Sequence, residues 1–260
     1  MPTTATDANG AELPCTGAYA GGYVEFQADV TGAVFPVTID PDFSVTSAAG
    51  DTYLNSYYTA RNWGAATSIS ISGSNRTLFK FDCSSVPSGA TPSAANIKIT
   101  KSDYYSNSRN VTISWYSISQ ANGDWIEGTG NGGANAASGE PCYAGKVANG
   151  SGGVTTTWAG SAGMNTANTD YENTVLASGT ANRADAADTQ YTYNLNANGL
   201  TRIAGWFGAT NTNYGLMVTA SDDHGSYHTS EAATAGYRPV LTVTYTTAAA
   251  GNPHYYYAQL

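Results

Sequence analysis

Charged residues are scarce in this chain: Lys, Arg, Asp and Glu make up 11% of its 260 residues, against about 25% in a typical soluble domain. The ten basic residues are scattered and are outnumbered by nineteen acidic ones, which gives a net charge of −9. This excludes the clustered cationic surface that binding to nucleic acid requires. The chain also has no apolar run approaching the ~18 residues that cross a bilayer, so we expect no membrane span.

Signal-peptide features and cysteines are scarce too. The N-terminal sequence MPTTATDANGAELPC lacks the cationic and apolar regions of a signal peptide, which is the pattern of a soluble protein that is cytoplasmic or already processed. The three cysteines are Cys15, Cys83 and Cys142. Either all are free thiols, or in an oxidising compartment one pair forms a disulfide and the third thiol bridges to another chain.

What the sequence has in abundance is Gly, Ala, Ser, Thr, Asn and Tyr, which predicts an uncharged polar surface. Three sequences of the form Asn-x-Ser/Thr are N-glycosylation candidates, although a chain this rich in Asn, Ser and Thr contains as many by chance. They begin at Asn75, Asn110 and Asn149.

Apolar and polar residues alternate with a period of two in many short segments, which is the pattern of strands with one buried face. Clusters of Gly, Asn, Ser and Pro separate these segments. The pattern predicts an all-β fold, a jelly-roll-like antiparallel sandwich of many strands. The strand segments are 23–30, 33–39, 68–72, 96–100, 111–118, 190–195, 214–220 and 239–247. One short helix is expected over 198–208, where apolar residues recur every three to four positions.

The chain divides into three parts on this pattern. Residues 1–42 are an N-terminal strand extension, residues 43–247 form the sandwich, and residues 248–260 are a tail containing three consecutive tyrosines. Within the sandwich, residues 128–163 are a long stretch rich in Gly, Ala and Asn, in which Tyr143 and Trp158 indicate a packed excursion.

The segment RTLFKFDCSSVPSGATPSAANIKI, residues 76–99, resembles the signature of the DNRLRE-type β-sandwich domain. In that signature an Arg-led strand runs into Phe-Asp, a Ser-containing turn, Pro-x-Gly-Ala and an Ala-led strand. Other segments match the family in order over residues 34–247: DTYLNSYYTARNWGAATSISIS, WIEGTGNG, TTTWAG and NTNYGLMVTASDDHGSYHTSEAATAGYRPVLTVTY.

The resemblance implies a non-catalytic module of a secreted or surface protein, since relatives of this domain include carbohydrate-binding and alginate-binding modules. The chain departs from the family pattern where Cys83 replaces the usual Leu and where His228-Thr229 replaces an aromatic residue and Ser-Arg. Residues 1–33 and 248–260 lie outside the likeness.

Catalysis would require a base near a nucleophile, or two carboxylates in one cleft. The densest group, SDDHGSYHTSE at 221–231, contains Gly225 between strand segments and is expected to form a hairpin turn, so we expect no enzyme. Turn carboxylates such as Asp51, Asp222 and Asp223 could hold a structural Ca²⁺, although Asp is also favoured in turns for capping its own backbone. We expect no other cofactor.

Two functions remain. Sugar rings stack on exposed aromatic faces, and adjacent residues on a strand cannot both point inward, so the tyrosine pairs are the best glycan-binding candidates. The set is Tyr57, Tyr58, Arg61, Trp63, Tyr104 and Tyr105. Alternatively, unpaired strand edges of one copy could add to another. The subunit-contact candidates are Tyr23, Val24, Phe26, Ala28, Val30, Tyr255, Tyr256 and Tyr257.

The main interpretation of the sequence is an extracellular, non-enzymatic subunit of a fibre or surface layer that assembles with itself through β-strand contacts. The alternative is a secreted carbohydrate-binding module whose partner is a polysaccharide.

Overall fold

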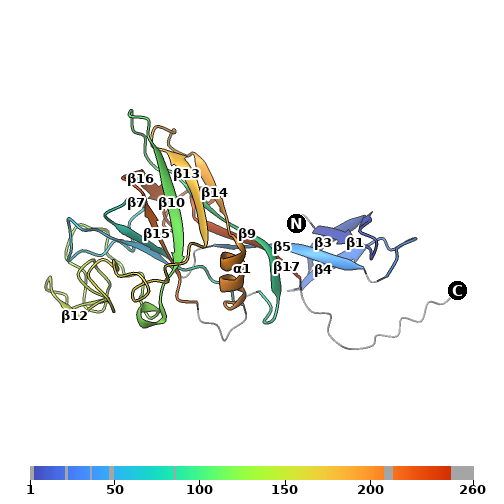
Figure 1. Ribbon diagram of the computed structural model, residues 1–260, viewed down its shortest axis with the longest axis horizontal. Helices are drawn as coiled ribbons and strands as arrows, with labels where there is room; N and C mark the ends of the chain where they lie inside the picture. Colours follow the sequence, from blue (N-terminus) through green and yellow to red (C-terminus); the bar gives the residue numbers. More distant parts are fainter. Residues whose placement is uncertain are drawn as a thin grey trace.

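The computed structural model describes residues 3–20, 23–35, 37–46, 50–84, 86–207 and 213–246. Two antiparallel sheets form the body of the fold (Figure 1). The six-stranded sheet has the order β14 (Gln190–Asn194), β9 (Thr91–Thr100), β17 (Val240–Thr246), β5 (Thr38–Thr46), β1 (Thr3–Thr6) and β2 (Glu12–Leu13). The five-stranded sheet has the order β13 (Ala177–Asn182), β10 (Asn110–Ser117), β15 (Leu216–Ala220), β8 (Arg76–Phe79) and β6 (Asp51–Leu54).

Smaller elements complete the described fold. Three two-stranded sheets are formed by β16 (Gly225–His228) with β7 (Ser68–Ile71), β11 (Val147–Ala148) with β12 (Val154–Thr156), and β3 (Cys15–Ala20) with β4 (Tyr23–Ala28). The α-helix is α1 (Ala197–Ala204), and two 3₁₀ turns are Gln120–Asn122 and Ala235–Tyr237. The prediction of an all-β antiparallel fold is confirmed. In the described ranges no helix has the length and apolar character needed to cross a membrane.

The main core lies between the two large sheets and draws side chains from both. In β10 the buried positions alternate with more exposed ones, so that Val111, Ile113 and Trp115 point inward. The Trp115 ring lies 5.4 Å from that of Phe79 and 5.9 Å from that of Tyr193. Trp115 thus fills the space between a strand of one sheet and a strand of the other, as the period of two predicts.

The predicted helix is present as α1, beside β9. Its N-terminus is capped by Asn196, whose side-chain oxygen accepts a hydrogen bond from the Gly199 amide at 3.0 Å. Ile203 on its inner face is fully buried.

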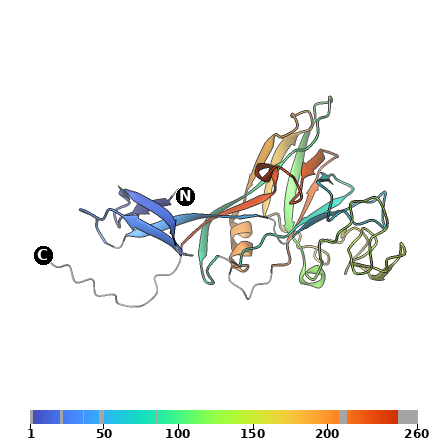
Figure 2. The ribbon, with the colours of Figure 1, turned by 180° about the vertical axis from the view of Figure 1, so that it is seen from behind.

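The N-terminal strands lie beyond one end of the sandwich, and β5 and β17 reach toward them (Figures 1 and 2). The first part of β5 pairs with β1, and the second part, Asp42–Thr46, pairs with β17. The sequence boundary predicted at residue 42 therefore falls inside one continuous strand.

The strand predicted over 23–30 is present as β4, but the strand predicted over 33–39 is wrong for its first residues. The backbone amide of Val34 donates to the Asp7 carboxylate at 3.1 Å, and its carbonyl accepts from the Ala8 amide at 2.8 Å. These bonds hold residues 31–35 as a turn and loop against the N-terminal hairpin, and the strand begins only at Thr38.

The packed excursion predicted over 128–163 is confirmed. Trp158 is 2% exposed, and its indole nitrogen donates to the Cys142 carbonyl at 2.9 Å. The buried Asp170 carboxylate accepts the amides of Gly160 at 2.7 Å, Ser161 at 3.0 Å and Thr166 at 2.9 Å. A buried carboxylate that accepts several backbone donors therefore holds this region together with the short strand pair of β11 and β12.

Buried His224 gives the fold a predictable pH dependence. Its Nδ1 lies 2.7 Å from the Tyr227 hydroxyl, and burial first, then the nearby Lys101 ammonium, lower the His224 pKa below its ordinary 6.5, against the smaller opposing effects of Asp103 and Asp185. Since an unfolded histidine takes up a proton that the folded one resists, the free energy of unfolding should fall as pH drops below about 6.5.

Urea unfolding between about pH 7 and pH 5 measures this dependence. His224→Gln, which does not titrate, should have a flatter profile than the wild type. Parallel profiles for the two proteins would contradict the assignment.

Candidate functional site

The turn after β6 presents two adjacent tyrosines to solvent. Tyr57 is 85% exposed and Tyr58 is 47% exposed. The side-chain oxygen of Asn55 accepts the amides of Tyr57 at 2.8 Å and Tyr58 at 3.3 Å, which closes an Asx turn and ends the strand. The prediction that this pair lies at the surface is confirmed.

Tyr58 belongs to a surface cluster with Arg61 and Trp63. The Arg61 guanidinium lies 4.1 Å from the centre of the Tyr58 ring, and the Trp63 ring lies 6.3 Å from the Tyr58 ring. Trp63 is half-buried and also packs at 4.8 Å on Tyr53. We define the aromatic surface as Tyr57, Tyr58, Arg61 and Trp63. Flat rings with a cation beside them suit stacking against the apolar face of a sugar ring.

A second loop, residues 127–133, lies directly against the aromatic surface. Arg61 donates to the Gly132 carbonyl at 2.7 Å. A side chain at Gly132 would start 2.2 Å from the Trp63 ring, and Gly132 has a φ of +78°. Glycine has no Cβ and adopts a positive φ without strain, so Gly132 lets the backbone of this loop lie against the Trp63 indole.

Asn62 joins the turn to the second loop from inside. It is 1% exposed, and its amide nitrogen donates to the carbonyls of Glu127 at 2.8 Å and Pro141 at 3.0 Å. Its side-chain oxygen accepts the amides of Gly64 at 3.0 Å and Gly130 at 2.9 Å. This buried side chain therefore adds to the backbone hydrogen bonds that join the turn and the second loop, from the Gly132 amide to the Asn62 carbonyl and from the Ala65 amide to the Gly130 carbonyl.

Two surface depressions share Thr67 and Ser68 in their lining, and the first of them also includes Trp63 of the aromatic surface. The first, of about 340 Å³, is lined by Trp63, Ala65, Ala66, Thr67, Ser68 and Asn131. The second, of about 470 Å³, is lined by Thr67, Ser68, Ser102, Asp103, Ser226, His228, Ala232, Ala233, Thr234 and Tyr237. We call the two together the groove.

An aromatic stack lines the second depression of the groove. The rings of His228 and Tyr237 lie 4.9 Å apart with an interplanar angle of 23°. Asp188 holds both, through His228 Nε2 at 3.2 Å and the Tyr237 hydroxyl at 3.1 Å. The lining of the groove therefore includes Trp63 in the first depression and the His228–Tyr237 stack in the second, together with hydroxyl, amide and carboxylate groups.

The other predicted tyrosine pair belongs to a different contact group. Tyr104 is 60% exposed, but the ring of Tyr105 is half-buried and faces the Arg183 guanidinium at 4.2 Å and the Lys101 ammonium at 5.4 Å. The structure does not bring this pair together with Tyr57 and Tyr58.

A third depression, of about 400 Å³, lies beside α1. It is lined by Glu172, Thr174, Leu176, Asn198, Thr201, Arg202 and Gly205. It contains no aromatic ring, and Glu172 and Arg202 form an ion pair with each other there. It therefore lacks the stacking surface that sugar binding needs.

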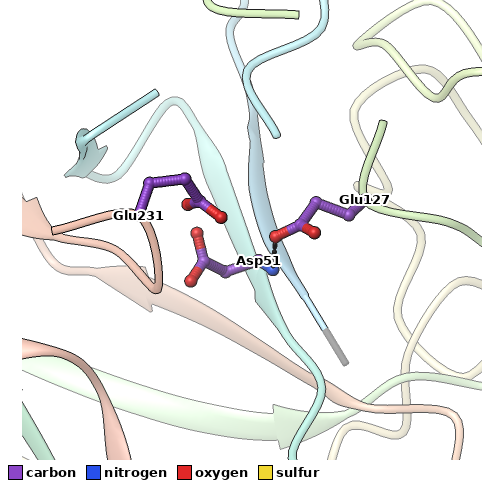
Figure 3. A group of neighbouring side chains, drawn as sticks. All are labelled: Asp51, Glu127 and Glu231. Atoms are coloured by element: carbon purple, nitrogen blue, oxygen red, sulfur yellow. Dashed lines mark hydrogen bonds between the residues drawn. The ribbon is translucent and has the colours of Figure 1, made fainter. Parts of the chain in front are cut away.

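Three carboxylates converge on one another, from Asp51, Glu127 and Glu231 (Figure 3). One oxygen of each lies within 4.8 Å of the others. Burial, together with the nearby Glu231 and Glu127 and against the Ser230 amide, raises the pKa of Asp51 to about 8, and burial also raises the pKa of Glu127. Within the described residues, these three carboxylates are the side chains whose ligand atoms lie close enough together to bind one metal ion. We call it the acidic cluster.

The other predicted metal candidates are not part of the acidic cluster. Asp222 pairs with Arg109, and Asp223 lies 3.2 Å from the Arg183 guanidinium. The neighbouring His224 is fully buried beside Tyr227, so residues 221–231 do not assemble an acid, a base and a nucleophile at one point.

The predicted subunit-contact strand is paired within its own chain, since β4 forms a hairpin with β3 from Cys15↔Ala28 to Tyr23↔Ala20. This region supplies Tyr23, Val24, Phe26 and Ala28, and Val30 follows it with 44% exposure. Tyr255, Tyr256 and Tyr257 lie outside the described residues.

The three cysteines are free thiols within the chain; Cys83 and Cys142 are buried and Cys15 is partly exposed. Of the glycosylation candidates, Asn110 and Asn149 are exposed. Asn75 is 7% exposed, and its side-chain oxygen accepts the Ser56 amide at 2.9 Å, so its side chain is used inside the fold.

Comparison with known families finds a similarity in part of the chain. Residues 42–132 match a carbohydrate-binding module. The matching family is Carbohydrate-binding module family 96. Among curated proteins, none matches the chain significantly. The predicted relation to carbohydrate-binding modules is thus supported over these residues, which include the aromatic surface, while the resemblance to the DNRLRE-type domain over residues 34–247 stays a prediction.

Sequence reasoning identified the aromatic surface but missed Tyr237 and the role of His228 in the second depression of the groove. It also missed Glu127 and Glu231 as neighbours of Asp51. Both glutamates stand in segments already noted for their resemblance, WIEGTGNG and the Ser-Glu turn of SYHTSE. The acidic residues in these segments, together with Asp51, were the signal from which a joint site could have been predicted.

Asn62→Ala tests the connection between the turn and the second loop. The substitution removes four hydrogen bonds and leaves buried backbone groups without a partner, so it should lower the free energy of unfolding by about 2–4 kcal/mol. Asn131→Ala is the matched control, since Asn131 is exposed and accepts a single bond, from the Gly133 amide at 3.1 Å. The control should change stability by less than about 0.5 kcal/mol in urea unfolding. Equal effects would contradict the role of Asn62.

Proposed function

We propose that this chain is a non-catalytic carbohydrate-binding module that acts outside the cell and binds a polysaccharide across the aromatic surface and the groove. The observation that carries the proposal is the aromatic surface itself: Tyr57 and Tyr58 are exposed, Arg61 and Trp63 flank them, and all four lie in the segment that matches the carbohydrate-binding family. Exposed aromatic rings held rigidly in place bury apolar area at a low cost in side-chain entropy.

The groove supplies the hydrogen-bonding groups that a sugar needs. Ser68, Asn131 and Asp103 line it together with Trp63 and the His228–Tyr237 stack. A few polar groups around aromatic side chains are the usual composition of a ligand site, in which stacking gives affinity and hydrogen bonds give orientation. Two adjoining depressions suit a chain of sugars rather than a single one.

The charge distribution favours a neutral polysaccharide over a polyanionic one. The chain carries a net charge of −9. Asp103 lines the groove and Asp188 holds its aromatic stack. The cation in the aromatic surface, Arg61, is already engaged with Tyr58 and the Gly132 carbonyl. A uronic acid polymer would therefore meet repulsion.

The interpretation as a self-assembling fibre subunit is less well supported. It depends on N-terminal strands that lack partners in their own chain. β1 pairs with β5 and β2, and β3 pairs with β4, so these strands have intramolecular partners.

Affinity electrophoresis tests the proposed function. Migration of the wild type should be retarded by a neutral β-glucan or mannan in the gel, and less by alginate. Tyr57→Ala and Tyr58→Ala should each weaken this retention about three- to ten-fold, the loss of one stacking contact. Tyr104→Ala is the control, because Tyr104 is also exposed, at 60%, but lies outside the aromatic surface.

Two results would contradict the proposal. One is a wild type that no polysaccharide in the panel retards. The other is retention that falls with Tyr104→Ala and not with the substitutions at Tyr57 and Tyr58.

A further inference from the structure

The acidic cluster is assembled from three distant segments of the chain. Asp51 begins β6, Glu127 belongs to the second loop, and Glu231 follows β16. Figure 3 shows the Asp51 and Glu231 carboxylates turned toward each other, with Glu127 bonded to the backbone of Asp51. That bond, from the Asp51 amide to Glu127 Oε1, is 2.7 Å. Gly50 permits the approach, since a side chain there would start 2.8 Å from Glu127 Cβ.

Two carboxylate oxygens in the acidic cluster are buried without a hydrogen-bond donor. Asp51 is fully buried; its Oδ2 accepts the Ser230 amide at 2.8 Å, but its Oδ1 accepts from no described group. Glu231 Oε2 is in the same condition. Among the described residues, no Lys, Arg or His forms an ion pair with any of the three carboxylates. Buried carboxylates in such a setting are normally paired or coordinate a metal.

The separation of the three carboxylates suits a cation between them. Oxygens on opposite sides of a Ca²⁺ ion lie about 4.6–5.2 Å apart, because each Ca–O distance is about 2.3–2.6 Å. Ligand atoms within 4.8 Å of one another fit that gap.

We propose that Asp51, Glu127 and Glu231 bind one Ca²⁺ ion, with Asp51 Oδ1 and Glu231 Oε2 as ligands. Ca²⁺ accepts carboxylates in monodentate or bidentate fashion and in flexible geometry, so three carboxylates and a few waters complete its shell. Mg²⁺ requires near-octahedral geometry and keeps several of its waters, which suits a buried carboxylate cluster less well.

The ion would connect the segments that form the groove. The Glu127 carbonyl accepts from Asn62, the buried residue behind the aromatic surface. Thr229, two residues before Glu231, donates from its hydroxyl to the Ala66 carbonyl at 2.7 Å, and Ala66 lines the groove. A ligand from each of three segments would therefore brace the groove.

Metal content and thermal unfolding of the full chain test the site with Ca²⁺ alone. After EDTA treatment and dialysis against CaCl₂, elemental analysis should find one Ca²⁺ per chain. With Ca²⁺ at 100 times its Kd, the unfolding temperature should rise by about 5–10 °C. Equimolar MgCl₂ should give a much smaller rise.

Asp51→Asn keeps the shape of the side chain and replaces a carboxylate ligand by a neutral amide. The variant should remain folded without Ca²⁺, because the amide fills the same space without adding a buried charge, and it should lose the Ca²⁺-dependent rise. Asp222→Asn is the control, since Asp222 is exposed and pairs with Arg109. It should respond to Ca²⁺ as the wild type does.

Any of three results would overturn the proposal: no rise in the wild-type unfolding temperature in millimolar CaCl₂, an equal rise with Mg²⁺, or a full rise in Asp51→Asn. If Asp51→Asn fails to fold, Glu231→Gln takes its place with the same expected outcome. Polysaccharide binding is not part of these measurements, so the calcium site and the proposed function can fail separately.

Discussion

The side chain of Asn62 is the interaction on which the functional region depends. It is buried between the turn after β6 and the loop 127–133, and its four hydrogen bonds leave none of its amide groups unused. Two backbone hydrogen bonds also join the segments, from the Gly132 amide to the Asn62 carbonyl at 2.9 Å and from the Ala65 amide to the Gly130 carbonyl at 2.8 Å. The Asn62 side chain adds the buried contacts that tie both segments to the Glu127 and Pro141 carbonyls.

Glycine makes this close packing possible. A side chain at Gly64 would start 2.3 Å from the Glu127 carbonyl oxygen, and one at Gly128 would start 2.5 Å from the Asn62 amide. A side chain at Gly132 would likewise start 2.2 Å from the Trp63 ring. Each glycine costs conformational entropy on folding, and here that cost is offset by contact between backbone and buried side chains. The abundance of glycine in residues 128–163 thus reflects packed loops.

The strands and the helix could be predicted because their signals are local. Alternation in β10 and β17, and the three- to four-residue spacing in α1, depend on neighbours along the sequence. The sequence did not predict the turn at 31–35, because the hydrogen bonds that hold it come from Asp7 and Ala8, more than twenty residues away. The acidic cluster could not be predicted for the same reason. Asp51 lies 76 residues from Glu127 in the sequence, and Ser230, whose amide donates to Asp51, lies 179 residues away. Tyr57 and Tyr58 are exposed for a different reason than the alternation along a strand that predicted their exposure, since both lie in the Asx turn closed by Asn55. The half-buried state of Tyr105 depends on Arg183 across the fold.

The account places sugar binding on one surface, at loops that belong to no large sheet. Hydrogen–deuterium exchange of the full chain, with and without the neutral polysaccharide that retards it most, tests this directly. The account predicts slower exchange on binding in residues 55–68, 127–133 and 226–237, with little change in β1–β4 or α1. Slower exchange confined to the N-terminal strands or to the depression beside α1 would contradict it.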